Sequence, residues 1–238
     1  MSTGIFAYDG WNPPAIPKDI PVYLAKPGSD IGTTMNEGID FLMDKCDNII
    51  FFGPGCDPQG EAIHAHSETL STHMYPLVTC GRVRHEADGW KDFREVGRAA
   101  QLKLFGANGT IIQNASVLLS GYGISVANFG MNRSAIDRMA RFTHQYFDSD
   151  GPFPVIRDAT LCGYGKVLSM CAWCSRVTIF MLPDGYNSVI YSNPECNPYA
   201  GKCDGDTSRE AINRISTGMA ERPPDLNFFD SVNDRPSA

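Results

Sequence analysis

Four prolines between residues 13 and 21 decide how this 238-residue chain can begin. Proline fixes φ, lacks a backbone N–H and pushes the residue before it toward extended geometry. Residues 1–28 therefore cannot form a long first helix, and we expect an extended N-terminal arm with a short strand at Val22–Ala25. The arm is too apolar to float free, so it should lie on its own domain or on a neighbouring subunit. Its large apolar side chains include Tyr8, Trp11, Ile16 and Ile20.

Composition indicates a globular protein. The chain is 42% hydrophobic and 20% charged, which excludes disorder as the global state. We find no internal repeat and no linker, and therefore expect a single domain with the arm at 1–28, a core at 29–221 and a C-terminal tail at 222–238. A net charge of −7 without a basic stripe argues against nucleic-acid binding. The longest apolar runs fall far below the ~20 residues of a membrane span, and no secretory signal is visible.

The pattern of apolar residues predicts both helices and strands, without a sustained β-α-β alternation. We therefore expect an α+β fold, with an antiparallel β-sandwich core and peripheral helices, rather than a doubly wound parallel sheet. The helices are predicted at 33–46 (with a Thr34/Glu37 capping box), 90–104, 133–147 and from Thr207 onward. The strands are predicted at Asn48–Phe52, 75–84, Thr110–Ile112, Ser116–Leu119, Gly123–Asn128 and within 166–182, the last forming a hairpin with Asn187–Tyr191.

A cluster of histidines is the densest polar feature. If its segment is a strand, His64, His66 and Glu68 share one face, with His73 nearby. Imidazole and carboxylate groups ligate metals such as zinc, so the cluster is a candidate site for a metal-dependent hydrolase-like enzyme. The alternative is a polar loop or edge with solvated histidines. The sequence has no glycine-rich phosphate loop and no G-x-S-x-G elbow, so an enzymatic interpretation depends on this cluster alone.

Eight cysteines are most simply free, partly buried thiols in a reducing compartment. Cys171 and Cys174 form a C-x-x-C half-site, which Cys196 and Cys203 could complete as a zinc staple of a binding module. A structural zinc knuckle usually has a second tight pair, whereas six residues separate Cys196 from Cys203. Buried structural cysteines are therefore the favoured interpretation.

One segment late in the chain resembles a known family. Phe180–Val189 reads F-M-L-P-D-G-Y-N-S-V, which is similar to a segment of cypovirus polyhedrins, the proteins that crystallise around virions inside infected insect cells. That family carries an aromatic residue, Leu-Pro, Tyr-Asn-Ser and a β-branched residue at this point. Gly4–Gly10 resembles the family's early aromatic strand, and Asp30–Thr34 its passage from strand to helix. The best-known polyhedrins begin with a helical arm, which the prolines forbid here.

The resemblance implies a structural protein without catalytic residues, cofactor or metal. It implies homotrimers that pack into a cubic crystal lattice, as occlusion bodies in the cytoplasm of a host cell infected by an insect virus. The expected partners are further copies of the chain and virions, with no nucleic acid and no membrane. The candidate assembly contacts are the arm residues Tyr8, Trp11, Ile16 and Ile20.

Such bodies have to persist at neutral pH and dissolve in an alkaline gut. The nine tyrosines and eight cysteines are neutral at pH 7 and ionise at about pH 8.5–10 and above. The lysines begin to lose their positive charge over the same range. Packed acidic molecules would then repel one another. The candidate pH-responsive residues, in or near the hairpin, are Tyr186, Tyr191 and Tyr199.

Overall fold

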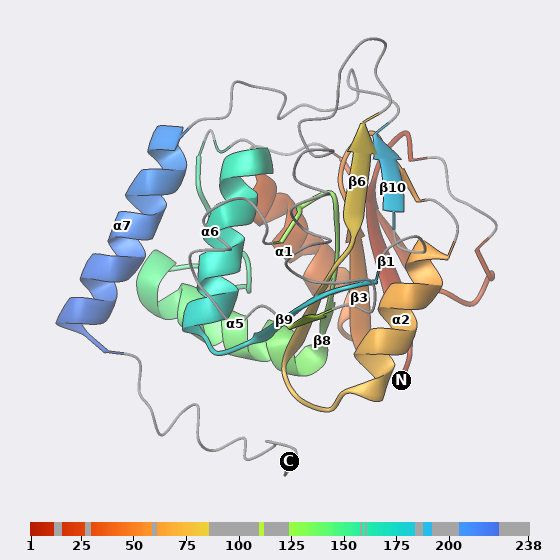
Figure 1. Ribbon diagram of the computed structural model, residues 1–238, viewed down its shortest axis with the longest axis horizontal. Helices are drawn as coiled ribbons and strands as arrows, with labels where there is room; N and C mark the ends of the chain where they lie inside the picture. Colours follow the sequence, from red (N-terminus) through yellow and green to blue (C-terminus); the bar gives the residue numbers. More distant parts are fainter. Residues whose placement is uncertain are drawn as a thin grey trace.

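The computed structural model describes residues 1–11, 16–26, 30–58, 61–85, 110–111, 124–157, 159, 161–183, 188–191 and 205–223. These segments form a mixed α/β fold with a seven-stranded sheet, a three-stranded sheet and five helices among the described residues (Figure 1). Within the same part of the chain, none of the helices is long and apolar enough to cross a membrane.

The seven-stranded sheet is mixed. Its spatial order is β2 (Val22–Ala25), β1 (Thr3–Tyr8), β3 (Asn48–Phe52), β8 (Asn128–Asn132), β5 (Leu77–Cys80), β9 (Thr178–Met181) and β7 (Thr110–Ile111). Strands β2, β1, β3, β5 and β9 run parallel, whereas β8 and β7 run antiparallel to them. The expected antiparallel sandwich is thus replaced by a largely parallel sheet. The β-α-β alternation was hidden because the helices at 62–72 and 161–174 were not predicted as helices.

The three-stranded sheet has the order β4 (Cys56–Pro58), β10 (Ser188–Tyr191) and β6 (Arg82–His85). Strand β10 is antiparallel to β4 and parallel to β6. The predicted hairpin is therefore wrong, because β9 pairs with β5 and β7 in the large sheet while β10 joins the small one. A Pro-Asp-Gly turn signal shows where a strand stops, but it does not show which strand it pairs with.

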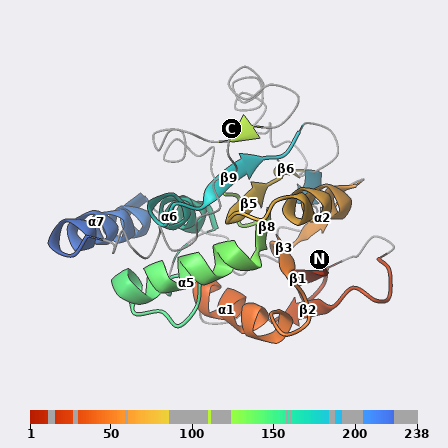
Figure 2. The ribbon, with the colours of Figure 1, turned by 90° about the horizontal axis from the view of Figure 1, so that it is seen from below.

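Helices cover both faces of the large sheet. They are α1 (Ile31–Leu42), α2 (Ala62–Thr72), α5 (Arg133–Phe147), α6 (Leu161–Cys174) and α7 (Gly205–Glu221). Figure 2 shows α1 and α5 on one side of the sheet and α2 on the other. Helix α6 joins the α1 and α5 core, and α7 packs outside it on α6 and α5.

Alternation along the strands divides the interior into two cores. Phe6, Phe51 and Phe129 point toward α1, α5 and α6, and the rings of Phe51 and Phe129 stack with centroids 4.6 Å apart. Their neighbours Ile5 and Ile50 point to the opposite face, into a smaller core. Successive side chains of a strand face opposite sides of the sheet, so a strand buried on both faces reads as a continuous apolar run.

Helix α5 follows the sequence prediction and α1 departs from it. Asn132 caps α5 by accepting a hydrogen bond from Ala135 N at 3.0 Å, and the helix spans the predicted 133–147. Helix α1 begins earlier than predicted, because Asp30 is its N-cap and accepts from Thr33 N at 2.7 Å. The Thr34/Glu37 capping box is therefore wrong, and Thr34 donates back to the Asp30 carbonyl at 2.9 Å.

The N-terminal arm lies on its own domain. Strand β2 occupies the predicted Val22–Ala25, and β1 lies between β2 and β3 inside the sheet. Tyr8 is 3% exposed. Trp11, Ile16 and Ile20 are half-buried and pack on the smaller core, with the Trp11 ring stacked on Phe52 at 5.9 Å. The proposed role of these side chains in assembly stays a prediction.

Other expected elements have mixed outcomes. The 75–84 segment forms β5 and β6, and the segment after Thr207 lies in α7. The strand expected at Gly123–Asn128 begins instead at Asn128. Of the expected strand segment 166–182, residues 166–174 belong to α6, so that part of the prediction is wrong, and Thr178–Met181 forms β9. Residues 90–104 and Ser116–Leu119 lie outside the described residues.

Candidate functional site

The histidine cluster lies on a helix, so the strand arrangement on which the metal hypothesis depended is absent from this segment. Along α2, His64 and Glu68 are exposed one turn apart, with Nε2 and Oε2 separated by 3.6 Å. His66 is buried, and His73 ends the helix with Nδ1 donating to the Thr69 carbonyl at 2.8 Å. Within the described segments, no three His, Cys, Asp or Glu side chains gather to hold a metal ion. The described geometry therefore gives the hydrolase-like hypothesis no support.

His66 belongs to a closed polar network between α2 and the sheet. Its Nε2 lies 2.9 Å from Asn128 Oδ1, and its Nδ1 lies 2.7 Å from Thr79 Oγ1. The amide oxygen only accepts, so Nε2 carries the proton and Nδ1 accepts from the threonine hydroxyl. Burial lowers the pKa of His66 to about 4, opposed by the hydrogen bond to Asn128. A neutral, fully paired imidazole fixes the register of α2 on the sheet and leaves no ring nitrogen for a metal or substrate.

The cysteine side chains that the structure describes are shielded from solvent. Cys46, Cys56, Cys80 and Cys171 are buried, and Cys174 is half-buried. Burial raises the pKa of Cys46 and of Cys174 to about 11, so both are thiols at neutral pH. Cys171 and Cys174 lie in the last turn of α6. The other two members of the postulated zinc staple, Cys196 and Cys203, lie outside the described residues.

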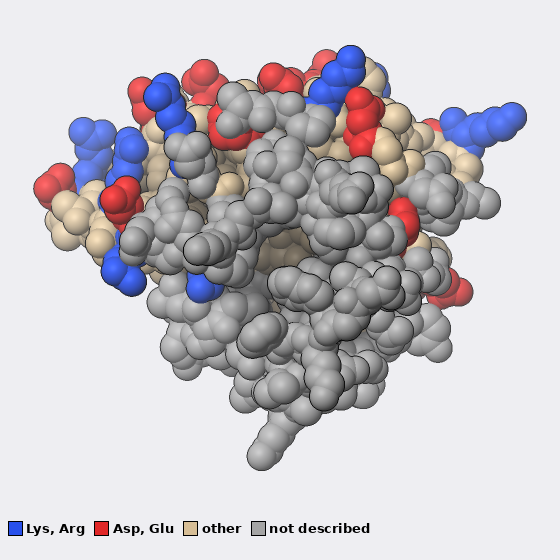
Figure 3. All heavy atoms as spheres, turned by 90° about the horizontal axis from the view of Figure 1, so that it is seen from above, with Lys and Arg blue, Asp and Glu red and all other residues tan. Residues whose placement is uncertain are grey.

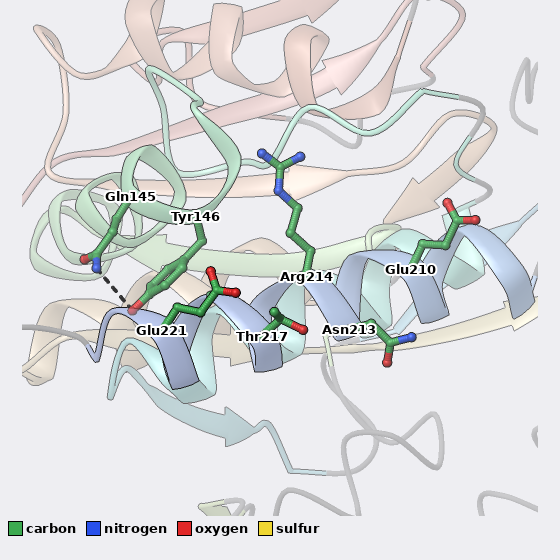
Figure 4. Close-up of a pocket in the computed structure, with 8 residues that line it drawn as sticks. Gln145, Tyr146, Glu210, Asn213, Arg214, Thr217 and Glu221 are labelled. Carbon is green, nitrogen blue, oxygen red and sulfur yellow. Dashed lines mark hydrogen bonds between the residues drawn. The ribbon is translucent and has the colours of Figure 1, made fainter.

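A shallow hollow of about 540 Å³ separates α5 from α7 (Figure 4). Gln145 and Tyr146 line it from α5, and Gln145 Nε2 donates to Tyr146 Oη at 3.2 Å. Glu210, Arg214 and Glu221 are exposed side chains that line it from α7. Small-molecule sites are usually concave and lined mainly by apolar and aromatic side chains, whereas this open hollow is lined mainly by polar and charged ones, so it is a weak candidate for a binding site.

The edge of the large sheet formed by β2 is a stronger candidate for an interaction surface. On the β1 side of this strand, the carbonyl of Pro21, just before β2, accepts from Ile5 N and the carbonyl of Ala25 accepts from Asp9 N, each at 2.9 Å. Backbone groups of successive residues point to opposite sides of a strand, so those of Val22 and Leu24 point outward. Among the described residues, no backbone group pairs with them. An open edge is a ready template for pairing with another chain.

Apolar side chains accompany this open edge. Leu24 is 53% exposed and Phe41 of α1 is 44% exposed. Tyr23 lies beside Phe41 with ring centroids 5.3 Å apart. We call Val22, Tyr23, Leu24 and Phe41 the β2 edge. Leu24 lies on the smaller-core face by alternation, and Phe41 lies on the α1 face, so exposed apolar groups flank the unpaired strand on both sides of the sheet.

Charged groups flank the β2 edge in a defined order. Glu37 and Phe41 lie one turn apart on the same side of α1. Lys45, in the turn that follows the helix, extends this row. Lys45 Nζ lies 3.0 Å from the centroid of the Phe41 ring, a cation–π contact. Burial, and secondarily the Glu37 carboxylate, raise the pKa of Tyr23. The row is therefore negative at one end, aromatic in the middle and positive at the other.

Sequence reasoning missed the β2 edge. It assigned pH response to Tyr186 and Tyr199, which lie outside the described residues, and to Tyr191, of which only the β10 backbone is described. Leu24 and Phe41 sit in apolar stretches that read as core. Only the strand order shows that β2 ends the sheet.

The face in Figure 3 carries Lys and Arg side chains intermingled with Asp and Glu along its described rim.

Comparison of the chain with protein-family models and with curated protein sequences gives no match.

Proposed function

We propose that this protein is a structural, self-assembling matrix protein that works without catalysis. Copies of the chain, as trimers, pack into the lattice of crystalline occlusion bodies in the cytoplasm of infected insect cells, and the bodies enclose virions. The resemblance to cypovirus polyhedrins supports the class of protein. The observation that carries the proposal is the β2 edge, where unpaired backbone groups coincide with exposed Leu24 and Phe41.

A matrix protein needs surfaces that bind its own copies. Isolated soluble proteins usually protect an edge strand with charges, proline or a bulge. The four residues of β2 are Val-Tyr-Leu-Ala, with no charge and no proline among them. Pro21 and Lys26 flank the strand, so the unprotected stretch is short. Within it, an open backbone edge favours association with a further copy.

Buried acids support dissolution in alkali. The pKa values of Tyr23 and Cys46 are raised above their ordinary values, chiefly by burial. An acid whose pKa is raised in the folded state stabilises that state below its ordinary pKa, and the contribution is lost as pH rises through the raised value. The window for both groups lies above about pH 9. Ionised Tyr23 would also face the Glu37 carboxylate at the β2 edge, so alkali opens the contact.

Expression in insect cells tests the proposal. We expect micrometre-sized bodies that give sharp powder-diffraction rings and clear above about pH 10. Leu24→Lys should abolish or disorder the bodies, because it places a charge at the unpaired edge. Val155→Lys is the matched control, because Val155 is 45% exposed and lies outside the β2 edge. A wild-type protein that stays a soluble monomer without bodies would overturn the proposal.

A further inference from the structure

We propose that β2 pairs antiparallel with β2 of a second copy across a two-fold axis, joining two seven-stranded sheets into one. This pairing rests on the proposed function for its partner, because self-assembly supplies the second copy. It deepens that function by naming the contact that would link one trimer to the next. The register, the side chains and the charges of the β2 edge each support it.

The backbone fixes the register. Val22 and Leu24 carry the outward N–H and C=O groups of β2. In an antiparallel ladder, two outward residues exchange both hydrogen bonds when they lie directly opposite each other. Pairing Val22 with Leu24 of the second copy satisfies every outward group of both residues. That register places the two-fold axis at Tyr23.

The side chains are compatible with this register on both faces. Val22 packs toward the smaller core and Leu24 shares its face by alternation, so exposed Leu24 would cover Val22 of the second copy. Tyr23 points to the α1 face, next to Phe6 and Phe41. At the axis each Tyr23 meets its counterpart in a non-hydrogen-bonded pair, with Cα atoms about 4.5 Å apart. Aromatic and aliphatic cross-strand pairs of this kind stabilise a sheet.

The charges are self-complementary. A two-fold axis perpendicular to the joined sheet makes the two α1 helices antiparallel beside it. The row of one copy then runs opposite to the row of the other, and Glu37 approaches Lys45 of the second copy twice by symmetry. An isologous interface uses the same patch on both subunits, so the second copy always presents the same row in the opposite direction. The exposed Phe41 rings lie between these charge pairs.

Charge exchange tests the pairing on purified full-length protein. Glu37→Lys and Lys45→Glu each place like charges opposite each other, so each variant alone should dimerise at least about tenfold more weakly than wild type in sedimentation equilibrium at low salt. An equimolar mixture of the two variants restores both attractive pairs and should dimerise like wild type. A mixture that stays as weak as its components would overturn the pairing. Val155→Lys should leave dimerisation unchanged.

A disulfide tests the register. Tyr23→Cys places two thiols at the axis, at a Cα separation compatible with a disulfide, so oxidation should give a covalent dimer. Leu24→Cys lies opposite Val22 and about 7–8 Å diagonally from its own counterpart, so it should cross-link much less. Equal cross-linking of the two variants would overturn the register. Circular dichroism of both variants checks that they fold.

The two proposals fail separately. Bodies in cells together with no dimer, no rescue by mixing and no cross-link would overturn the β2 pairing and leave the matrix function standing. Rescue and cross-linking in solution without bodies in cells would overturn the matrix function and retain the pairing.

Discussion

The buried imidazole of His66 should make the protein unstable in mild acid. Both ring nitrogens are paired in the neutral form and the side chain is fully buried. The pKa of His66 is lowered from 6.5 to about 4. Because the unfolded chain takes up the proton more readily, the folded state is fully stable above pH 6.5 and loses stability as pH falls toward 4.

The size of this effect follows from the shift. A pKa lowered from 6.5 to about 4 corresponds to a loss of about 3 kcal/mol below pH 4. At pH 5 the same linkage removes about 2 kcal/mol. Since domains are typically stable by about 5–15 kcal/mol, that loss is easily measured.

Urea denaturation at pH 8 and pH 5 measures the effect. Wild type should lose about 2 kcal/mol more than His66→Gln between the two pH values, although the variant should be less stable at pH 8. His64→Gln is the control, because His64 is exposed on the same helix and its removal should leave the wild-type loss nearly unchanged. Parallel pH profiles for wild type and His66→Gln would refute the reasoning. If His66→Gln does not fold, an NMR titration of wild type should still show one histidine that is neutral at pH 5.

Three further changes test other parts of the fold. Between neutral pH and pH 11, Cys46→Ala should lose about 2 kcal/mol less of its free energy of unfolding than wild type, since burial raises the thiol pKa to about 11. Equal losses of wild type and variant in urea denaturation would contradict this. Asn132→Ala should cost about 2–3 kcal/mol, because it removes the cap of α5 and the acceptor of Leu77 N; a thermal melt within a degree of wild type would rule it out. Asp148→Gly should stabilise the protein by about 1 kcal/mol, because Asp148 ends α5 at φ 55°; Asp150→Gly serves as the control in the same melt.

Two elements could be predicted correctly from nearby residues alone, because their apolar residues follow a simple strand or helix pattern. Asn48–Phe52 is bounded by polar and glycine residues and lies in the sheet as predicted. Helix α5 has a capping asparagine and a clear apolar face. Both features depend on neighbours within a few residues, so no tertiary information was needed.

Helices α2 and α6 escaped prediction for opposite reasons. Helix α2 buries a polar His66 and has no side-chain cap at its start, so its apolar stripe is weak. Helix α6 is enclosed between the main core and α7, so apolar residues occur all round it and leave no periodicity. Each pattern depends on packing partners far away in the sequence.

The candidate surface was hidden for a topological reason. Leu24 looks like a core residue because it lies in an apolar strand, and only the position of β2 at the end of the sheet exposes it. Phe41 likewise belongs to an amphipathic helix, and it is exposed because α1 lies at the edge of the sheet, beside β2. The Glu37–Lys45 spacing was visible, but its significance depends on symmetry between copies.

The position of β8 has a consequence for synthesis. It lies between β3 and β5 and is antiparallel to both, yet it follows them in the chain by more than forty residues. A nascent chain that has left the ribosome only as far as β6 therefore holds two apolar strands with no partner between them. The central sheet closes only when residues 128–132 emerge, so a chain truncated before that point should be a client of chaperones rather than a folded fragment.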